Sequence, residues 1–211
     1  MTNFIPIFPL SIVIYPGETV NLHVFEPRYK QLITECAEQK KPFGSPVLIG
    51  DELKEYGTLM EVRGVEKVYD NGEMDIRVRG RRVFRILEVV HEVPEKLYAG
   101  AIVHYPRNLS QPKPVVMILV LMAIRELHRL MEVSREFKKL DDALLSYDVA
   151  HESGLSQEEE YEMLCLLHEG QRLEYLKQHL GKILPVMVEI DRLKKRYKLN
   201  GHFQDPGIAK F

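Results

Sequence analysis

The sequence has few of the residues on which disulfide-stabilised and membrane-spanning proteins depend. It contains two cysteines, Cys36 and Cys165, which lie far apart in the chain and predict neither a disulfide framework nor a thiol metal site. The longest uncharged apolar run, residues 115–124, is about half of the roughly 20 residues that span a bilayer. The first residues lack the basic start and apolar run of a signal peptide. These absences predict a cytoplasmic protein that does not enter a membrane.

No part of the chain has a large excess of one charge. The 211 residues include 29 Lys plus Arg and 31 Asp plus Glu, which gives a formal net charge of -2. This balance argues against nucleic acid or an anionic membrane as a partner bound mainly by charge. Because 45% of the residues are hydrophobic, the composition is that of a globular protein and excludes general disorder.

Motifs for nucleotide-dependent and hydrolytic chemistry are also missing. The sequence has no phosphate loop, no Gly-x-Gly-x-x-Gly fingerprint and no nucleophile elbow. Its eight histidines are scattered singly, without the spacing of metal ligands. We therefore expect no cofactor, no bound metal and no catalytic residue, which means that the protein is not an enzyme.

Two halves of the chain differ in pattern. Residues 1–107 contain short β-type runs cut by Pro and Gly, whereas residues 115–199 have helical periodicity. Residues 108–114 form a Pro-rich connector, and residues 200–211 a loose tail. The predicted fold is α+β, with a β-rich, barrel-like first subdomain followed by an all-helical bundle.

Local signals place the elements of the β-rich half. Pro27 predicts the start of a helix, because proline suits the first helical position. The buried stripe of this helix is Tyr29, Leu32, Ile33 and Cys36. Asn71 and Gly72 predict the turn of a long hairpin, and the alternation of its strands is interrupted at Gly64 and Gly80. Bulges at these glycines would give a curved sheet.

The helical half shows longer periodicity. A first helix is predicted over about six turns, with the apolar stripe Val116, Leu119, Ala123, Leu127, Leu130 and Phe137. A second helix is expected after Asp142, and Ser156 with Glu159 forms a capping box for a third. The last long helical segment runs from Gln171 to Tyr197 and includes Pro185.

One charged cluster, the arginines between Arg77 and Arg85, has two interpretations. Guanidinium groups could bind phosphate or acidic peptide. Alternatively, these side chains form the solvated face of a strand and are balanced by Glu61 and Glu66 on its neighbour. The near-zero net charge favours the second interpretation.

Spaced motifs across most of the chain are more specific. They are Ile5-Pro6-Ile7-Phe8-Pro9-Leu10, Val13-Ile14-Tyr15-Pro16-Gly17, Leu22-His23-Val24-Phe25-Glu26-Pro27-Arg28-Tyr29, Pro42-Phe43-Gly44, Gly57-Thr58 and Arg172-Leu173-Glu174-Tyr175-Leu176. These motifs closely resemble those of the N-terminal, substrate-binding domain of the Lon protease family. The hairpin departs from the family pattern, because Val83 stands where relatives have the arginine of Gly-x-x-Arg, which leaves Arg81 and Arg82 as candidates to replace it.

The resemblance implies a PUA-like β-subdomain, a helical bundle and a role in holding polypeptide substrates. It implies a free-standing recognition domain without ATPase or peptidase parts. On this basis we expect a non-catalytic module that binds unfolded or tagged polypeptides or a partner protein, as an adaptor or accessory to proteolysis. A weak homodimer is allowed, and RNA binding through the Arg77–Arg85 strand is the alternative function. The candidate binding residues are Phe25, Arg28, Tyr29, Arg77, Arg79 and Arg82. We also expect Arg28 to anchor the first helix to the sheet.

Overall fold

The computed structural model describes residues 3–199, which form two compact units. The first unit contains the described residues up to Pro112 together with Gly154–Arg172. The second contains Lys113–Ser153 and the described residues from Leu173 onward. The sequence-based division differs in two respects, since it treated residues 108–114 as a connector and assigned all of residues 115–199 to a helical subdomain. The predicted tail, 200–211, lies outside the described residues.

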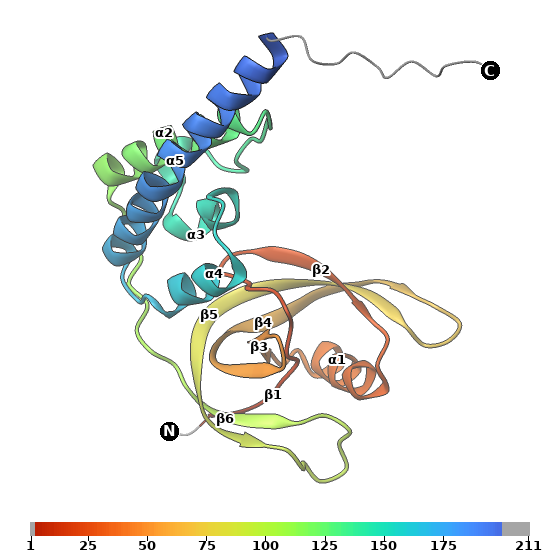
Figure 1. Cartoon of the computed structure of the whole chain (residues 1–211). Helices are drawn as coiled ribbons and strands as arrows, with labels where there is room; N and C mark the ends of the chain where they lie inside the picture. The colour runs from red at the N-terminus through yellow and green to blue at the C-terminus, as the bar shows by residue number, and fades with distance from the viewer. Residues whose placement is uncertain (1–2, 200–211) are drawn as a thin grey trace, which may run out of the picture. The chain divides into compact units, whose positions relative to one another are not determined.

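An antiparallel six-stranded sheet forms the body of the first unit (Figure 1). Its strands are β1 (Asn3–Pro6), β2 (Thr19–Val24), β3 (Phe43–Ile49), β4 (Glu52–Val68), β5 (Met74–Val90) and β6 (Gly100–His104). The strand order is β1-β6-β5-β4-β3, and β2 pairs with β5. With the helices described below, this sheet confirms the predicted α+β class.

The segment after β1 joins the two ends of this strand order. The Ile7 backbone N–H donates to the Ala99 carbonyl at 3.0 Å, just before β6, and the Phe8 N–H donates to the Gly44 carbonyl of β3 at 2.8 Å. Leu10 makes a further parallel bridge to β3. Because one segment is hydrogen-bonded on both sides, the sheet closes on itself, as expected for a barrel-like architecture.

The long hairpin of β4 and β5 turns where the sequence predicted. Gly72 has a φ of 76°, in the left-handed region that this turn requires, and its N–H donates to the Tyr69 carbonyl at 2.8 Å. The strand register shifts between Leu59 and Met60, opposite Gly80, and again next to Gly64. The two predicted bulges are therefore confirmed, and they let both 17-residue strands curve.

Helix α1 (Pro27–Gln39) packs against the curved sheet with the predicted face (Figure 1). Its buried residues are Tyr29, Leu32, Ile33 and Cys36. They join Phe8, Phe43, Met60, Met74, Ile76 and Val78 in the main hydrophobic core of the unit. Burying one large apolar side chain stabilises the folded state by about 1.5–3 kcal/mol. Because this cluster contains many such side chains, it is the main source of stability in the unit.

Helix α4 (Gln157–Cys165) belongs to the same unit and begins at the predicted capping box. The Ser156 N–H donates to Glu159 Oε2 at 2.8 Å, and the Glu159 N–H donates to Ser156 Oγ at 3.3 Å. The Tyr15 hydroxyl donates to the Glu160 carbonyl at 3.0 Å. Contacts of this kind explain why residues 154–172 join the sheet unit.

The second unit is helical. It contains α2 (Pro114–Leu130), η1 (Asp141–Ala143), α3 (Ser146–Val149), η2 (Ala150–Glu152) and most of α5 (Glu169–Leu199), which includes Pro185. The sequence was wrong about two features. Helix α2 ends at Leu130 rather than near Phe137. The second helix, expected directly after Asp142, is the short α3, which begins at Ser146 after the 3-10 turn η1. No helix within residues 3–199 combines the length and hydropathy needed to cross a membrane.

Candidate functional site

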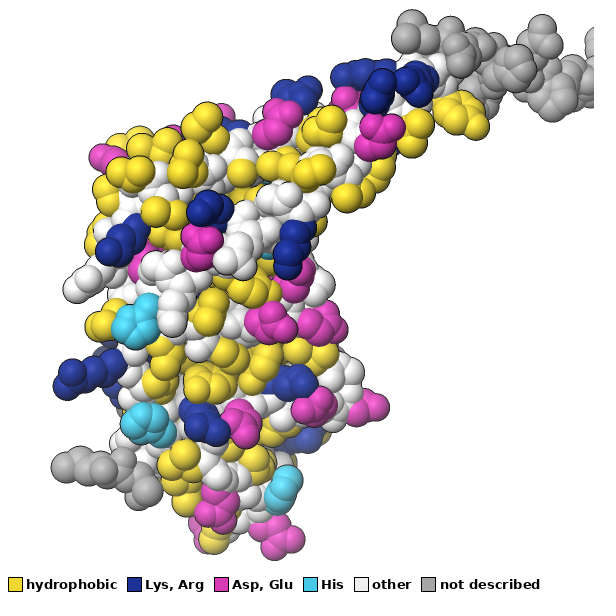
Figure 2. Space-filling view, turned by 60° about the vertical axis from the view of Figure 1, so that its left-hand side comes forward, with side chains coloured by type: hydrophobic (Ala, Val, Ile, Leu, Met, Phe, Trp, Pro, Cys, Tyr) yellow, Lys and Arg dark blue, Asp and Glu magenta, His cyan; other side chains and the backbone are white. Residues whose placement is uncertain are grey.

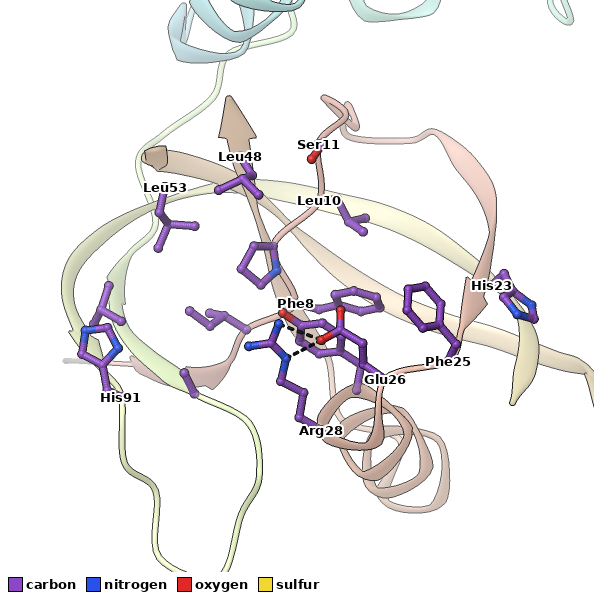
Figure 3. Close-up of a pocket in the computed structure, with 15 residues that line it drawn as sticks. Phe8, Leu10, Ser11, His23, Phe25, Glu26, Arg28, Leu48, Leu53 and His91 are labelled. Carbon is purple, nitrogen blue, oxygen red and sulfur yellow. Dashed lines mark hydrogen bonds and ion pairs between the residues drawn. The ribbon is translucent and has the colours of Figure 1, made fainter. Parts of the chain in front are cut away.

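A cavity of about 550 Å³ opens on the first unit beside the start of α1 (Figure 3). Four separate stretches of the chain line it. They contribute Ile7, Phe8, Pro9, Leu10 and Ser11; His23, Phe25, Glu26, Arg28 and Tyr29; Leu48 and Leu53; and Val89, His91 and Ala99. Most of these side chains are apolar, and a volume in this range suits a small ligand or several residues of a peptide.

The floor of the cavity is aromatic. The Phe8 and Tyr29 rings stack at a centroid distance of 4.0 Å with an interplanar angle of 18°, and both residues are buried. Burial raises the pKa of the Tyr29 hydroxyl, while the nearby Arg28 guanidinium opposes this rise. Phe25 differs, since it follows β2 and is 59% exposed (Figure 3). The site therefore joins a fixed aromatic floor to a projecting phenylalanine.

One ion pair lies among these apolar side chains. Both Nε and Nη2 of Arg28 donate to Glu26 Oε2, at 2.9 and 2.8 Å, and the Arg28 guanidinium carbon lies 4.6 Å from the centre of the Tyr29 ring (Figure 3). Glu26 is the N-cap residue of α1, but its carboxylate binds Arg28 and does not cap the helix. The expectation that Arg28 anchors α1 to the sheet is not met: about half of its side chain is exposed, and its partners Glu26 and Tyr29 are local.

His23 lies at the edge of the cavity beside Phe25, with ring centroids 6.2 Å apart. Its Nδ1 lies 2.7 Å from Asp75 Oδ1, and its Nε2 lies 3.2 Å from Glu73 Oε2. The hydrogen bond to Asp75 raises the pKa of His23 above 6.5, and that to Glu73 acts in the same direction. His23 therefore lies between two carboxylates at this edge of the site, and both favour its protonated form.

The predicted arginine residues do not join this cavity. Arg77 pairs with Glu66 at 3.3 Å, and the guanidinium carbon of Arg82 lies 3.6 Å from the centre of the Tyr105 ring. Arg79 and Arg82 line a separate hollow of about 520 Å³, which also contains a glutamate. That glutamate, Glu61, lies 3.7 Å from Arg81. The contacts of Glu61 and Glu66 confirm the cross-strand balance that the sequence predicted.

The predicted candidates thus divide between two places. Phe25, Arg28 and Tyr29 meet in the apolar cavity, while Arg77, Arg79 and Arg82 lie on β5 outside it. Sequence analysis missed the apolar residues that complete the cavity from distant segments, chiefly Phe8, Leu10, Leu48, Leu53 and Val89. Among the described residues, no group of three or more His, Cys, Asp or Glu side chains is placed to hold a metal.

Comparison with known families assigns this architecture. The model of the ATP-dependent protease La (Lon) substrate-binding domain matches residues 5–182 of the chain, which includes every residue that lines the cavity. The chain belongs to the Lon substrate-binding domain family. The sequence resemblance is therefore confirmed, and the family is one of substrate recognition by a domain that is not itself catalytic.

Solved structures of Lon N-terminal domains agree with this fold. A Lon N-terminal domain protein from Xanthomonas campestris is 26% identical, with a TM-score of 0.65 over 83% of this chain and 98% of that chain. The N-terminal domain of the Mycobacterium avium complex Lon protease has a TM-score of 0.62 over 85% of this chain and 98% of that chain. Because only 14% of the residues are identical, this second similarity shows a shared fold and nothing more.

Proposed function

We propose that this Lon substrate-binding domain holds unfolded polypeptides by inserting their apolar side chains into the cavity beside α1. The observation that carries the proposal is the exposed Phe25 next to the buried Phe8 and Tyr29 stack. An exposed large aromatic residue at the edge of an apolar cavity is typical of binding sites rather than of ordinary surface. Unfolded chains expose the apolar residues that such a cavity takes from water.

The chemistry of the cavity favours a broad choice of apolar segments. The cavity is lined by aliphatic side chains, which form no directional interactions with a ligand: Leu10, Leu48, Leu53 and Val89. The Arg28 and Glu26 pair presents both a donor and an acceptor beside them, and polar backbone groups of a bound segment could use either. We infer from this arrangement that selection depends on the exposure of apolar residues more than on their order. As an adaptor or accessory to proteolysis, such a module would favour damaged or incompletely folded clients.

Titration with a permanently unfolded, fluorescently labelled model polypeptide tests the proposal. Replacement of Phe25 by Ala should weaken binding by roughly tenfold, because about 1.4 kcal/mol is lost when one large apolar contact is removed. Phe4→Ala is the matched control, since Phe4 is also about half exposed but does not line the cavity. Equal effects of the two replacements, or no binding by the wild type at high micromolar concentration, would contradict the proposal.

The alternative of RNA binding predicts a different result. Affinity for a single-stranded RNA should then fall steeply with salt and should depend on Arg79 and Arg82. Polypeptide binding through the apolar cavity should change little with salt and should be unaffected by Arg79→Ala. The same two titrations, made at low and high salt, distinguish the two functions.

A further inference from the structure

Strand β2 lies at an open edge of the sheet. Within residues 3–199, β5 is the only strand that pairs with β2, so one side of β2 has no partner strand. The ladder between the two strands is regular, with successive residue pairs along all of β2 and no shift of register. An edge strand of this kind presents a row of backbone N–H and C=O groups that can pair with another chain.

The alternation of the ladder shows which backbone groups of β2 face outward. Directly before the strand, the Gly80 N–H of β5 donates to the Glu18 carbonyl at 2.9 Å. Along an antiparallel pair, residues that bond across the pair alternate with residues whose N–H and C=O point away from it. Counted from Glu18 in the observed register, the outward residues are Thr19, Asn21 and His23. Each offers one donor and one acceptor to a further strand.

A second open edge shows how this fold protects such groups. Residues 61–68 of β4 pair only with β5, because the pairing with β3 ends at Met60. Shifts of register interrupt this ladder on both sides of Val65. Half of the eight residues are also charged: Glu61, Arg63, Glu66 and Lys67. Bulges and charged side chains are the usual means by which proteins prevent a further strand from adding to an edge.

The edge of β2 lacks this protection. Its sequence, Thr-Val-Asn-Leu-His-Val, contains no Lys, Arg, Asp, Glu or Pro. The one side chain that ionises near neutral pH is that of His23, which lies between Asp75 and Glu73, so these carboxylates balance its charge. The contrast with β4 indicates that the edge of β2 is open for binding.

This edge leads directly to the apolar cavity. β2 ends at Val24, and Figure 3 shows the next residue, Phe25, at the end of the strand beside the cavity. Side chains alternate along the strand: Val20 and Leu22 pack against the main hydrophobic core, whereas the side chains of the outward residues are exposed. A chain that pairs with β2 would therefore reach the cavity without a turn.

We propose that an extended segment of an unfolded polypeptide adds to β2 as an antiparallel strand and places a side chain in the cavity beside Phe25. The inference rests on the proposed function of the cavity and supplies the main-chain contacts for it. An extended backbone is the occupant that this edge selects, because it repeats N–H and C=O groups at the spacing of a strand. Antiparallel pairing is the more stable of the two directions.

Exposed apolar side chains elsewhere do not offer the same contacts. Figure 2 shows hydrophobic side chains gathered on the helical second unit. The exposed apolar residues of α2 are Val115, Ile118, Leu119 and Met122. Within a helix, however, the backbone groups are already paired with one another, so this face has no means of holding an extended backbone. The edge of β2 therefore suits an unfolded chain better than the apolar face of α2 does.

The geometry also predicts the pattern of the bound segment. Residues directly opposite each other in an antiparallel pair have their side chains on the same face. Segment residues opposite Val20 and Leu22 extend the apolar face, whereas those opposite Asn21 bond the edge and carry side chains on the exposed face. A segment in which apolar and polar residues alternate, with an aromatic residue at its end for the cavity, should bind best.

Backbone methylation of a peptide tests this arrangement on the unaltered protein. The probe is a fluorescently labelled peptide of alternating valine and threonine that ends in phenylalanine. N-methylation of its threonines removes the N–H groups that bond β2 and should weaken binding by roughly tenfold or more. N-methylation of its valines is the matched control and should leave the affinity unchanged, because those N–H groups point away from β2. Equal effects of the two modifications, or a greater effect at the valines, would overturn the proposal.

A substitution at one residue of β2 tests the edge from the side of the protein. Asn21→Pro removes an outward N–H and none that bonds β5, which edge strands tolerate. It should weaken binding of the parent peptide by roughly tenfold, whereas Asn21→Ala, which keeps the N–H, should not. Thermal unfolding establishes that both variants are folded.

Phe25→Ala separates this inference from the proposed function. If Phe25→Ala weakens binding and Asn21→Pro does not, the cavity binds polypeptides but the edge of β2 takes no part, and the inference is overturned. If the wild type binds no polypeptide, the proposed function and the inference both fail. A dimer of the free chain that Asn21→Pro dissociates and the peptide does not displace would assign the edge to a second copy and would also overturn the inference.

Discussion

Phe8 and Tyr29 stack with their ring centroids 4.0 Å apart, although 21 positions separate them in the sequence. Phe8 belongs to the segment that closes the sheet, and Tyr29 to the first turn of α1. Their contact therefore joins the seam of the barrel-like sheet to its helix. The same contact forms the floor of the cavity that we propose binds polypeptides, so stability and binding depend on one pair of rings.

Phe8→Ala should destabilise the protein much more than Phe25→Ala. We expect a loss of about 3–5 kcal/mol in the free energy of unfolding for Phe8, because a buried ring is replaced by a cavity. Phe25 is mostly exposed, and its loss should be within about 1 kcal/mol. Urea denaturation followed by circular dichroism measures both values. Similar losses in the two variants would mean that the stacked pair does not support the fold.

His23 should titrate above 6.5, and this pKa should depend on Asp75. Because folding raises the pKa of His23, its contribution to stability is complete below pH 6.5 and is lost as the pH rises through the raised value. Replacement of Asp75 by Asn removes the largest cause of the shift and should return the pKa toward 6.5. NMR titration of the His23 ring protons measures it directly. If the pKa of His23 is unchanged in the Asp75→Asn protein, groups other than Asp75 cause the shift.

Elements with local signals were predictable from the sequence. The hairpin turn at Asn71 and Gly72 and the start of α1 at Pro27 each depend on the conformational preferences of one or two residues. The closure of the sheet has no such signal, because the bond between the Phe8 N–H and the Gly44 carbonyl joins backbone groups that every residue except proline carries. The complete cavity could not be predicted either, because its walls come from four distant segments and no local signal shows that these segments meet.

Helix α2 shows why periodicity can fail. Almost all residues of its first half are apolar, so the pattern cannot select one buried face. The predicted stripe included Leu119, which is 51% exposed, whereas the buried face includes Met117, Val120 and Ile124. No glycine marks the end of this helix. Glu132 takes the left-handed conformation that glycine usually adopts there, with a φ of 57°. A non-glycine residue in this role is uncommon and cannot be anticipated from its type.

Gly80→Ala should destabilise the sheet, whereas Gly64→Ala should not. A β-carbon on Gly80 would collide with the Tyr15 carbonyl oxygen, a backbone atom that cannot move alone. At Gly64 the nearest atom is the flexible end of Glu66, at 3.4 Å. We expect a loss of about 1–3 kcal/mol for Gly80→Ala from overpacking and a change within about 0.5 kcal/mol for Gly64→Ala. Thermal unfolding compares two glycines that both lie at bulges of the same hairpin, and a tolerated alanine at residue 80 would contradict the close approach.

Arg172→Met should be among the most damaging single substitutions in the chain. Arg172 is fully buried, and its Nη1 donates to Asn108 Oδ1 and to the Leu166 carbonyl, each at 2.8 Å, while Nη2 donates to Glu169 Oε2 at 2.8 Å. Removal of the guanidinium leaves the buried carboxylate of Glu169 without this charge partner, which typically destabilises by about 3–5 kcal/mol.

The exposed pair of Arg129 and Glu126 provides the matched comparison for this buried pair. Its two side chains are also three residues apart on a helix, at 2.7 Å, but are 59% and 42% exposed. Arg129→Met should therefore lower the free energy of unfolding by less than about 1 kcal/mol. Addition of Glu169→Gln to Arg172→Met should recover part of the loss, because it removes the buried charge. Urea denaturation of the four proteins measures these differences, and no recovery in the double variant would show that lost packing, rather than the loss of the Arg172 contact to the Glu169 carboxylate, accounts for the effect.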